Sequence, residues 1–257
     1  MSNGLDPIEQ FEIHPAFEGL GSFHVFGHEI TFTNSALMMS ISVALISLFL
    51  LAGSSKKALV PGRLQSVVEI SYEFVANMIR STAGRDGLKF FPFIYALFMF
   101  ILLANVLGLI PFFFTPTSHI IVTFTLAMMV MTTVLVVGIW KNGVKFLKLF
   151  WPSGVPFFLK IIIVTPLEII SFFSRPLSHS VRLWANMLAG HIMLKLFAIF
   201  IIMMFTGLVG IAKIGAVAPF AMVVILTPLE ILVAFLQAYV FAILTSVYIN
   251  DALHPGH

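Results

Sequence analysis

Charged residues are scarce in this chain, and cysteine is absent. Only 10% of the 257 residues are Asp, Glu, Lys or Arg, whereas 60% are hydrophobic and the mean hydropathy is +1.06. A soluble domain carries about 25% charged residues, so the composition excludes a water-soluble fold and indicates a lipid environment. Without cysteine the chain forms neither disulfides nor cysteine–metal sites. The net charge of +3 is scattered and gives no reason to expect nucleic acid, and no pattern predicts a cofactor.

Positive charge is also missing from the N-terminal part of the chain. No Lys or Arg precedes Lys56, so we do not expect a cleaved signal peptide, which needs a positively charged start. Residues 1–30 form a polar segment that holds His14, His24 and His28. Their spacing in an irregular segment favours a solvated extracytoplasmic tail over a metal site.

The first apolar run, residues 31–51, is long enough to cross about 30 Å of hydrocarbon. Lys56, Lys57 and Arg63 follow it, and the positive-inside rule therefore predicts a cytoplasmic side here and an N-terminus outside. Residues 63–82 then carry polar side chains at steps of three and four, which predicts an amphipathic helix along the inner membrane surface. This polar stripe consists of Ser66, Glu69, Glu73, Asn77 and Arg80.

The middle of the chain contains the longest stretch without charge. No Asp, Glu, Lys or Arg lies between Lys89 and Lys141, which predicts a transmembrane helical hairpin over residues 90–140. Its two spans are expected at about 90–112 and 118–140. The cytoplasmic end of the hairpin is marked by Lys141, Lys145 and Lys148.

The last part of the chain is apolar but contains embedded charges. Residues 156–206 and 214–250 predict two helices joined by a turn near 207–215. Each helix is longer than a perpendicular crossing needs, so both are expected to be tilted or kinked. The natural kink points are Pro166, Pro176 and Pro228. The sequence thus predicts an all-α polytopic membrane protein in which residues 31–257 form one membrane domain with a cytoplasmic C-terminus.

Arg182 is the strongest candidate for a functional residue. A charged side chain in the bilayer centre costs about 2.5–3.5 kcal/mol, and apolar sequence continues on both sides of this permanently charged guanidinium. On a helix, Arg175 and Glu168 lie seven and fourteen residues before it on nearly the same face. Asn186 is one turn further on that face, whereas His191 points the opposite way. Such a row suits proton movement better than contact with lipid.

The last helix supplies a second row of polar residues. Glu230, Gln237 and Tyr248 fall on one of its faces. Gln237 can position Arg182, and Glu230 can meet His191 across the helix pair. Because imidazole changes protonation near neutral pH, we expect His191 and Glu230 to form a proton relay.

Structural roles remain open for several of these residues. Thr-Pro-Leu-Glu occurs at 165–168 and at 227–230 and matches a helix start, so Glu168 or Glu230 could be a capping residue. Arg182 could instead hold two helices together through a salt bridge. Other expected structural roles are a pairing of Arg175 with His179 near the cytoplasmic surface, headgroup contacts of Lys195 and Lys213, and an interhelical hydrogen bond of Asn105.

The run Arg182-Leu-Trp-Ala-Asn-Met-Leu-Ala-Gly190 resembles the R-L-F-G-N-M-x-A-G signature of subunit a from F-type ATP synthases. Three further features agree in order, and the likeness covers about residues 30–250. They are Asn105-Val-Leu-Gly-Leu-Ile-Pro111, Glu168, and Leu236-Gln-Ala-Tyr-Val-Phe241. Trp184-Ala185 replaces the Phe-Gly of the signature, a change in packing next to Arg182.

The resemblance implies roles for individual residues. Arg182 takes the place of the family's essential arginine, Gln237 that of its nearby glutamine, and Glu168 that of a cytoplasmic-side channel acid. Many bacterial relatives have Glu after the Ala-Gly and His seven residues before the glutamine. In this chain the two residue types are swapped: His191 follows the Ala-Gly, and Glu230 lies seven residues before the glutamine. This resembles the mitochondrial pattern, and the site keeps one acid and one imidazole.

The resemblance also implies the machine to which the chain contributes. Subunit a sits beside a rotating ring of c subunits, is held by peripheral-stalk b subunits, and catalyses no bond-making alone. Its two offset half-channels load and unload protons on the ring carboxylates and so couple proton flow to rotation. The expected location is the inner (plasma) membrane of a bacterium, with the mitochondrial inner membrane as the alternative. Sodium coupling stays open, because the ligands of the ring would decide it.

Two other classes of function compete with this expectation. A proton-coupled secondary transporter should have paired inverted halves and a substrate-sized polar pocket, and the sequence shows neither clearly. A structural membrane anchor would leave Arg182, His191 and Glu230 unexplained.

Overall fold

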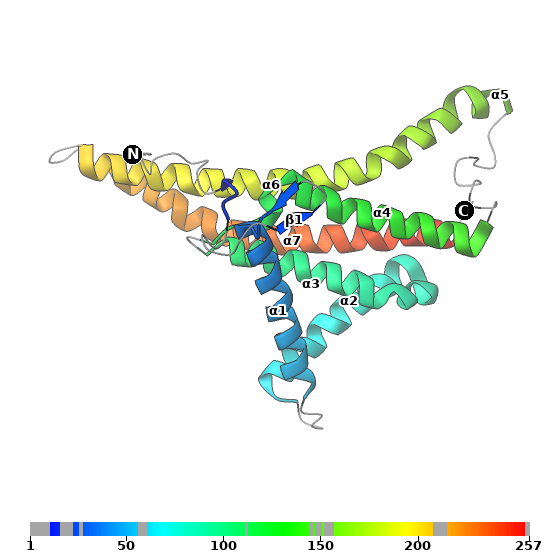
Figure 1. Ribbon diagram of the computed structural model, residues 1–257, viewed down its shortest axis with the longest axis horizontal. Coiled ribbons are helices and arrows are strands. Elements are labelled where there is room, and N and C mark those ends of the chain that lie inside the picture. Colours follow the sequence, from blue (N-terminus) through cyan, green and yellow to red (C-terminus); the bar gives the residue numbers. More distant parts are fainter. Residues whose placement is uncertain are drawn as a thin grey trace. The chain divides into compact units, whose positions relative to one another are not determined.

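The computed structural model describes residues 11–15, 23–25, 28–55, 61–110, 113–143, 146, 151, 157–207 and 215–254. Most of this part of the chain is helical (Figure 1). The elements in chain order are β1 Phe23–Val25, β2 His28–Ile30, α1 Asn34–Ser54, α2 Arg63–Gly87, the 3₁₀ turn η2 Leu88–Phe90, α3 Phe91–Gly108, the 3₁₀ turn η3 Pro116–Ser118, α4 Ile120–Asn142, α5 Phe157–Leu159, the π-helical turn η5 Lys160–Val164, α6 Thr165–Gly207 and α7 Val217–Leu253.

Five helical stretches within the described residues are long and apolar enough to cross a membrane. They are Asn34–Ser54, Arg63–Gly108, Ile120–Asn142, Ile162–Thr206 and Val217–Leu253. In lipid a helix satisfies its own backbone hydrogen bonds, which is why apolar runs of this length become helices. The predicted all-α polytopic membrane fold is therefore confirmed. Lys56, Lys57, Pro111, Lys145, Lys148 and Lys213, which the sequence predictions used, lie outside the described residues.

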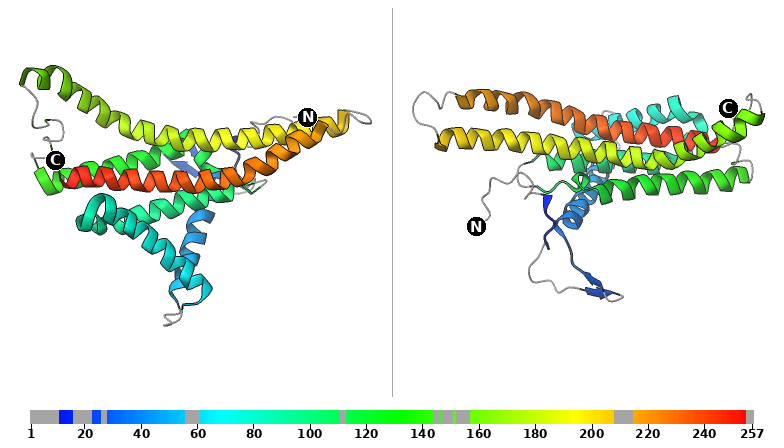
Figure 2. Two further views of the ribbon diagram at one scale, coloured as in Figure 1. Left: turned by 180° about the vertical axis from the view of Figure 1, so that it is seen from behind. Right: turned by 90° about the horizontal axis from the view of Figure 1, so that it is seen from above.

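The chain divides into two compact units, each assembled from segments distant in sequence. Unit 1 comprises Met1–Ile46, Phe100–His119 and Trp184–Gln237, and unit 2 comprises Ser47–Met99, Ile120–Leu183 and Ala238–His257. In unit 1 the C-terminal half of α6 lies beside the N-terminal half of α7, as the yellow and orange ribbons of Figure 2 show. The prediction of a single membrane domain stays a prediction, because α6 and α7 each contribute to both units.

The residues before α6 show how the helix accommodates a proline. The turn η5 consists of five π-helical residues, and the N–H of Thr165 donates to the carbonyl of Lys160. Pro166 follows directly and has no N–H, and its ring would clash with the carbonyl four residues earlier in a regular α-helix. A π-turn widens the backbone at such a position. Pro176 and Pro228 lie inside α6 and α7.

Residues 23–25 and 28–30 of the N-terminal segment form strands that its composition does not predict. β1 and β2 pair antiparallel, with Phe23 opposite Ile30 and Val25 opposite His28. The prediction of an irregular segment is therefore wrong for these residues, because a three-residue strand is too short to show an alternating pattern. The Thr33 hydroxyl then accepts a hydrogen bond from the Ala36 N–H at 3.3 Å and caps the start of α1.

Helix α2 has the amphipathic character predicted for it. Its buried stripe is Val75, Ala76, Met78, Ile79, Ala83 and Gly87. Glu69, Glu73, Asn77 and Arg80 of the predicted polar stripe are exposed. The helix continues past the predicted end at residue 82, and Gly84 interrupts it with a positive φ of 64°, a conformation that glycine adopts most readily. Its position along the membrane surface stays a prediction.

The connection between α3 and α4 in unit 1 is held by buried polar side chains. Asn105 donates to the carbonyl of Ala234 at 3.3 Å and accepts a hydrogen bond from the Thr117 hydroxyl at 2.8 Å. The predicted interhelical hydrogen bond of Asn105 is thus confirmed. The ring of His119 stacks on Phe114, with 5.0 Å between centroids.

The packing of α1 on α2 predicts a strong size limit at Gly53. A side chain at this position would overlap Val68 of α2, so we expect Gly53→Val to destabilise unit 2 by about 1–3 kcal/mol. The measurement is the thermal unfolding of the detergent-solubilised assembled complex. Gly62→Val is the matched control, because an added Cβ there meets nothing within 4 Å. Equal unfolding temperatures of the two variants would contradict this packing.

The stack of the half-buried His119 on Phe114 predicts a pH-dependent stability. Burial lowers the pKa of this imidazole below its usual value of 6.5, and its hydrogen bond with the Phe11 backbone only partly offsets that effect. The folded state thus disfavours the charged ring, so its contribution to stability is complete above the unfolded pKa and is lost as the pH falls below it. Between about pH 7.5 and 5.5, the unfolding temperature of wild type should therefore fall more than that of His119→Phe. His14→Phe, at an exposed site, should behave as wild type; an equal fall in all three would exclude the effect.

Candidate functional site

His191 of α6 and Glu230 of α7 form a buried acid–imidazole pair in unit 1. The Nδ1 of His191 lies 3.6 Å from Oε1 of Glu230, and the two residues are only 8% and 4% exposed. The predicted meeting of these side chains across the helix pair is confirmed. Two side chains that can exchange a proton are thus removed from solvent in the middle of long apolar helices.

The surroundings of the pair orient it. The hydroxyl of Thr115 lies 3.1 Å from Nε2 of His191, on the ring edge away from Glu230. Gly190 makes room for the carboxylate, because a Cβ there would come within 2.6 Å of Oε1. Within the part of the chain that the structure describes, neither oxygen of Glu230 has a hydrogen-bond partner. A buried carboxylate without such a partner is costly and is characteristic of a functional group.

Thr115 was not predicted from the sequence. It lies 76 residues before His191, in the connection between α3 and α4. The only local signal was the turn around Pro116, which says nothing about the helix that the turn contacts. The hydroxyl at Thr115 can donate or accept, so it can hold either neutral tautomer of the imidazole.

Arg182 and Asn186 are exposed on α6. Neighbouring exposed residues on α6 include the apolar Phe173, Leu177 and Met193 and the polar Ser174 and Ser178. No ion pair or hydrogen bond of the Arg182 side chain is present within the described residues of unit 2. A charged group exposed on a membrane-spanning helix needs a partner from outside this unit to be stable in lipid. Glu168, also in unit 2, is half-buried.

Arg175 does not extend the exposed row that contains Arg182. Its Nη1 donates to Oδ2 of Asp251 at 3.0 Å, and the guanidinium lies 5.1 Å from the ring centroid of Tyr248. The predicted pairing of Arg175 with His179 is wrong. The reason is that α7 extends to Leu253 and so carries a carboxylate within reach of Arg175.

His179 is instead packed among aromatic rings. Its ring centroid lies 3.7 Å from that of Phe241 and 6.0 Å from that of Tyr248. The next residue, Ser180, exchanges a hydrogen bond of 3.0 Å with Thr123 of α4. Polar side chains of α4, α6 and α7 therefore occur together inside unit 2.

The remaining predicted residues have the following positions. Gln237 is buried at 6% exposure on the α7 segment of unit 1, and Lys195 is half-buried on α6. The approach of the Gln237 amide to Arg182 stays a prediction. Among the described residues no group of three or more His, Cys, Asp or Glu side chains could hold a metal ion.

The helix-start interpretation of the repeated Thr-Pro-Leu-Glu is wrong at 227–230, whereas α6 begins at Thr165 with Glu168 in its first turn. Thr227 lies inside α7, and its hydroxyl donates back to the carbonyl of Val223 at 2.8 Å. Thr165 is preceded by η5 and is already helical. Glu230 therefore does not cap the start of a helix, which removes that structural explanation for it, whereas the capping role of Glu168 stays a prediction.

Comparison with known proteins shows the family to which the chain belongs. The family model of the ATP synthase A chain matches residues 36–250. The chain is 60% identical over 253 residues to ATP synthase subunit a of Rhodopseudomonas palustris strain HaA2, which covers 98% of this chain and 99% of that protein. It is 58% identical over 254 residues to the subunit a of Nitrobacter winogradskyi, with coverages of 98% and 100%. The identity to the Maricaulis maris subunit a is 56% over 259 residues, with 98% of each chain covered. The chain belongs to the ATP synthase A chain family.

Proposed function

We propose that this chain carries protons to and from the rotor ring of an F-type ATP synthase, with His191 and Glu230 at the inner end of the outer half-channel. The observation that carries the proposal is their buried pair, in which Nδ1 and Oε1 are 3.6 Å apart. Such a pair can pass one proton without leaving a second buried charge. The third member, Thr115, fixes the imidazole through Nε2.

The geometry supports a relay rather than a permanent salt bridge. A structural ion pair would be expected to satisfy the carboxylate with further hydrogen bonds, whereas the described residues offer none to Glu230. Its oxygens therefore remain ready to accept a proton from a water molecule or from His191. The backbone at Gly190, with no side chain, lets the carboxylate lie directly against α6.

Arg182 is proposed to separate the outer half-channel from the inner one. Its guanidinium group is exposed on α6. A carboxylate on a partner in the membrane would satisfy it, and the fixed charge would favour the ionised form of that carboxylate. Proton release from the ring would therefore occur next to Arg182, and direct flow of protons past it would be opposed.

Glu168 is proposed as the acid of the inner half-channel. It is half-buried in the first turn of α6. Gln237 and Asn186 are proposed to orient the guanidinium of Arg182, and Tyr248 and Arg175 to line the inner path. A membrane potential then contributes about 2.3 kcal/mol per charge per 100 mV, which the ring converts into rotation.

The same proposal includes the membrane in which the chain lies, its orientation there and its partner subunits. Its bacterial relatives and its apolar helices support the bacterial plasma membrane. The positive-inside rule places the N-terminus outside and the C-terminus in the cytoplasm. The c-ring and the b subunits are the proposed partners, and the subunit alone is not an enzyme.

The role of Arg182 predicts a specific loss of proton pumping. Membrane vesicles that carry the Arg182→Ala complex should show less than about a tenth of the ATP-driven acidification of wild type, because ring carboxylates would no longer be discharged beside a fixed charge. Arg80→Ala is the matched control, since it removes an exposed arginine of α2 whose side chain donates to nearby Asn77. Immunoblots of the purified complex check assembly. Normal pumping by an assembled Arg182→Ala complex would contradict the proposal.

A further inference from the structure

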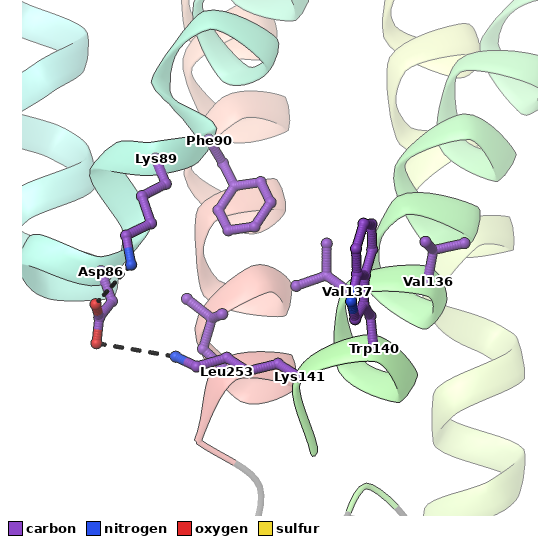
Figure 3. Close-up of a pocket in the computed structure, with 8 residues that line it drawn as sticks. All are labelled: Asp86, Lys89, Phe90, Val136, Val137, Trp140, Lys141 and Leu253. Carbon is purple, nitrogen blue, oxygen red and sulfur yellow. Dashed lines mark ion pairs between the residues drawn. The ribbon is translucent and has the colours of Figure 1, made fainter. Parts of the chain in front are cut away.

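A cavity in unit 2 combines an apolar interior with a charged rim. It encloses about 560 Å³, within the usual range of small-ligand sites. Its lining consists of Asp86, Lys89, Phe90, Val136, Val137, Trp140, Lys141 and Leu253. Figure 3 shows Asp86 and Lys89 on one side and Trp140 on the other, with Leu253 between them. None of these residues belongs to the proposed proton path.

The cavity lies where apolar helices end. Lys89 lies two residues before the start of α3. Lys141 is in the last turn of α4, and Leu253 is the last residue of α7. No charged residue occurs between the two lysines. Trp140 is 88% exposed beside them. Tryptophan and lysine at helix ends are typical of the boundary between hydrocarbon and headgroups.

The rim of the cavity has more positive than negative charge. Nζ of Lys89 is 3.6 Å and Nζ of Lys141 is 3.9 Å from the carboxylate of Asp86, so both ion pairs are longer than hydrogen bonds. His254 approaches the same carboxylate at 3.8 Å. Two ammonium groups against one carboxylate leave an excess of one positive charge. Both lysines, 77% and 44% exposed, keep donors for an additional anion.

We propose that this cavity binds one phospholipid with an anionic headgroup, its phosphate held by Lys89 and Lys141 and the start of an acyl chain between Phe90 and Val137. A phosphate oxygen fits ammonium donors at the membrane boundary, and the exposed apolar residues beside it, Val136 and Trp140, continue the surface for the chain. Asp86 competes with the phosphate for the same lysines, so it tunes the affinity. A small apolar cavity with a two-lysine rim suits a lipid better than a protein helix.

The test uses the assembled complex reconstituted in phosphatidylcholine with a trace of phosphatidylglycerol that carries a photoreactive acyl chain. Labelled peptides are identified by mass spectrometry. We expect labelling at Val136–Lys141 that unlabelled phosphatidylglycerol displaces, whereas phosphatidylcholine and inorganic phosphate do not. Lys89→Gln with Lys141→Gln should lower this labelling about tenfold. The control Arg63→Gln with Arg80→Gln removes the same charge from exposed positions of α2 and should leave it unchanged.

A second variant changes the result in the opposite direction. Asp86→Asn frees both lysines and should raise the labelling, which a folding defect would not do. Equal labelling of wild type and the double lysine variant, or equal displacement by phosphatidylcholine, would reduce the site to ordinary bulk-lipid contact and overturn the proposal. Protection of Val136–Lys141 by another subunit, with no lipid label, would also overturn it. None of these readouts depends on proton pumping, so the proposed function can fail or hold independently.

Discussion

The absence of water in the bilayer core is the constraint on which the rest of this structure depends. It requires helices, because no other open structure satisfies the backbone there, and it makes every embedded charge expensive. The chain meets this cost in two ways. Arg175 is paired with Asp251, whereas His191 and Glu230 share a buried site in which the carboxylate lacks a hydrogen bond within the described residues. The first arrangement is stable, and the second is suited to exchange a proton.

Much of the fold could be predicted because the same constraint determines where long runs without charged residues occur in the sequence. The uncharged run between Lys89 and Lys141 predicts two spans, and α3 and α4 begin within two residues of the predicted positions. The β1–β2 hairpin could not be predicted in this way. Its three-residue strands lie in a polar segment, where neither period nor burial distinguishes a strand from a loop.

The candidate site was predictable along each helix but not between helices. Periodicity places Glu230 and Gln237 on one face of α7, and both are buried. The contact of Thr115 with His191 depends on how a turn packs against α6, and no local pattern records that. The pairing of Arg175 with Asp251 was missed because it depends on where α7 ends. The Thr-Pro-Leu-Glu at 227–230 was misleading, since a proline inside a membrane helix resembles one at its start.

The most direct test of the relay is to exchange its two members. In His191→Glu with Glu230→His, one acid and one imidazole remain in the same buried space, whereas each single substitution leaves two acids or two imidazoles that disfavour each other's charge. Proton pumping by the assembled double variant should exceed that of the weaker single variant by about tenfold or more. If the complex is intact but the double variant pumps no faster than the weaker single variant, the account is contradicted. The pair would then be a structural contact.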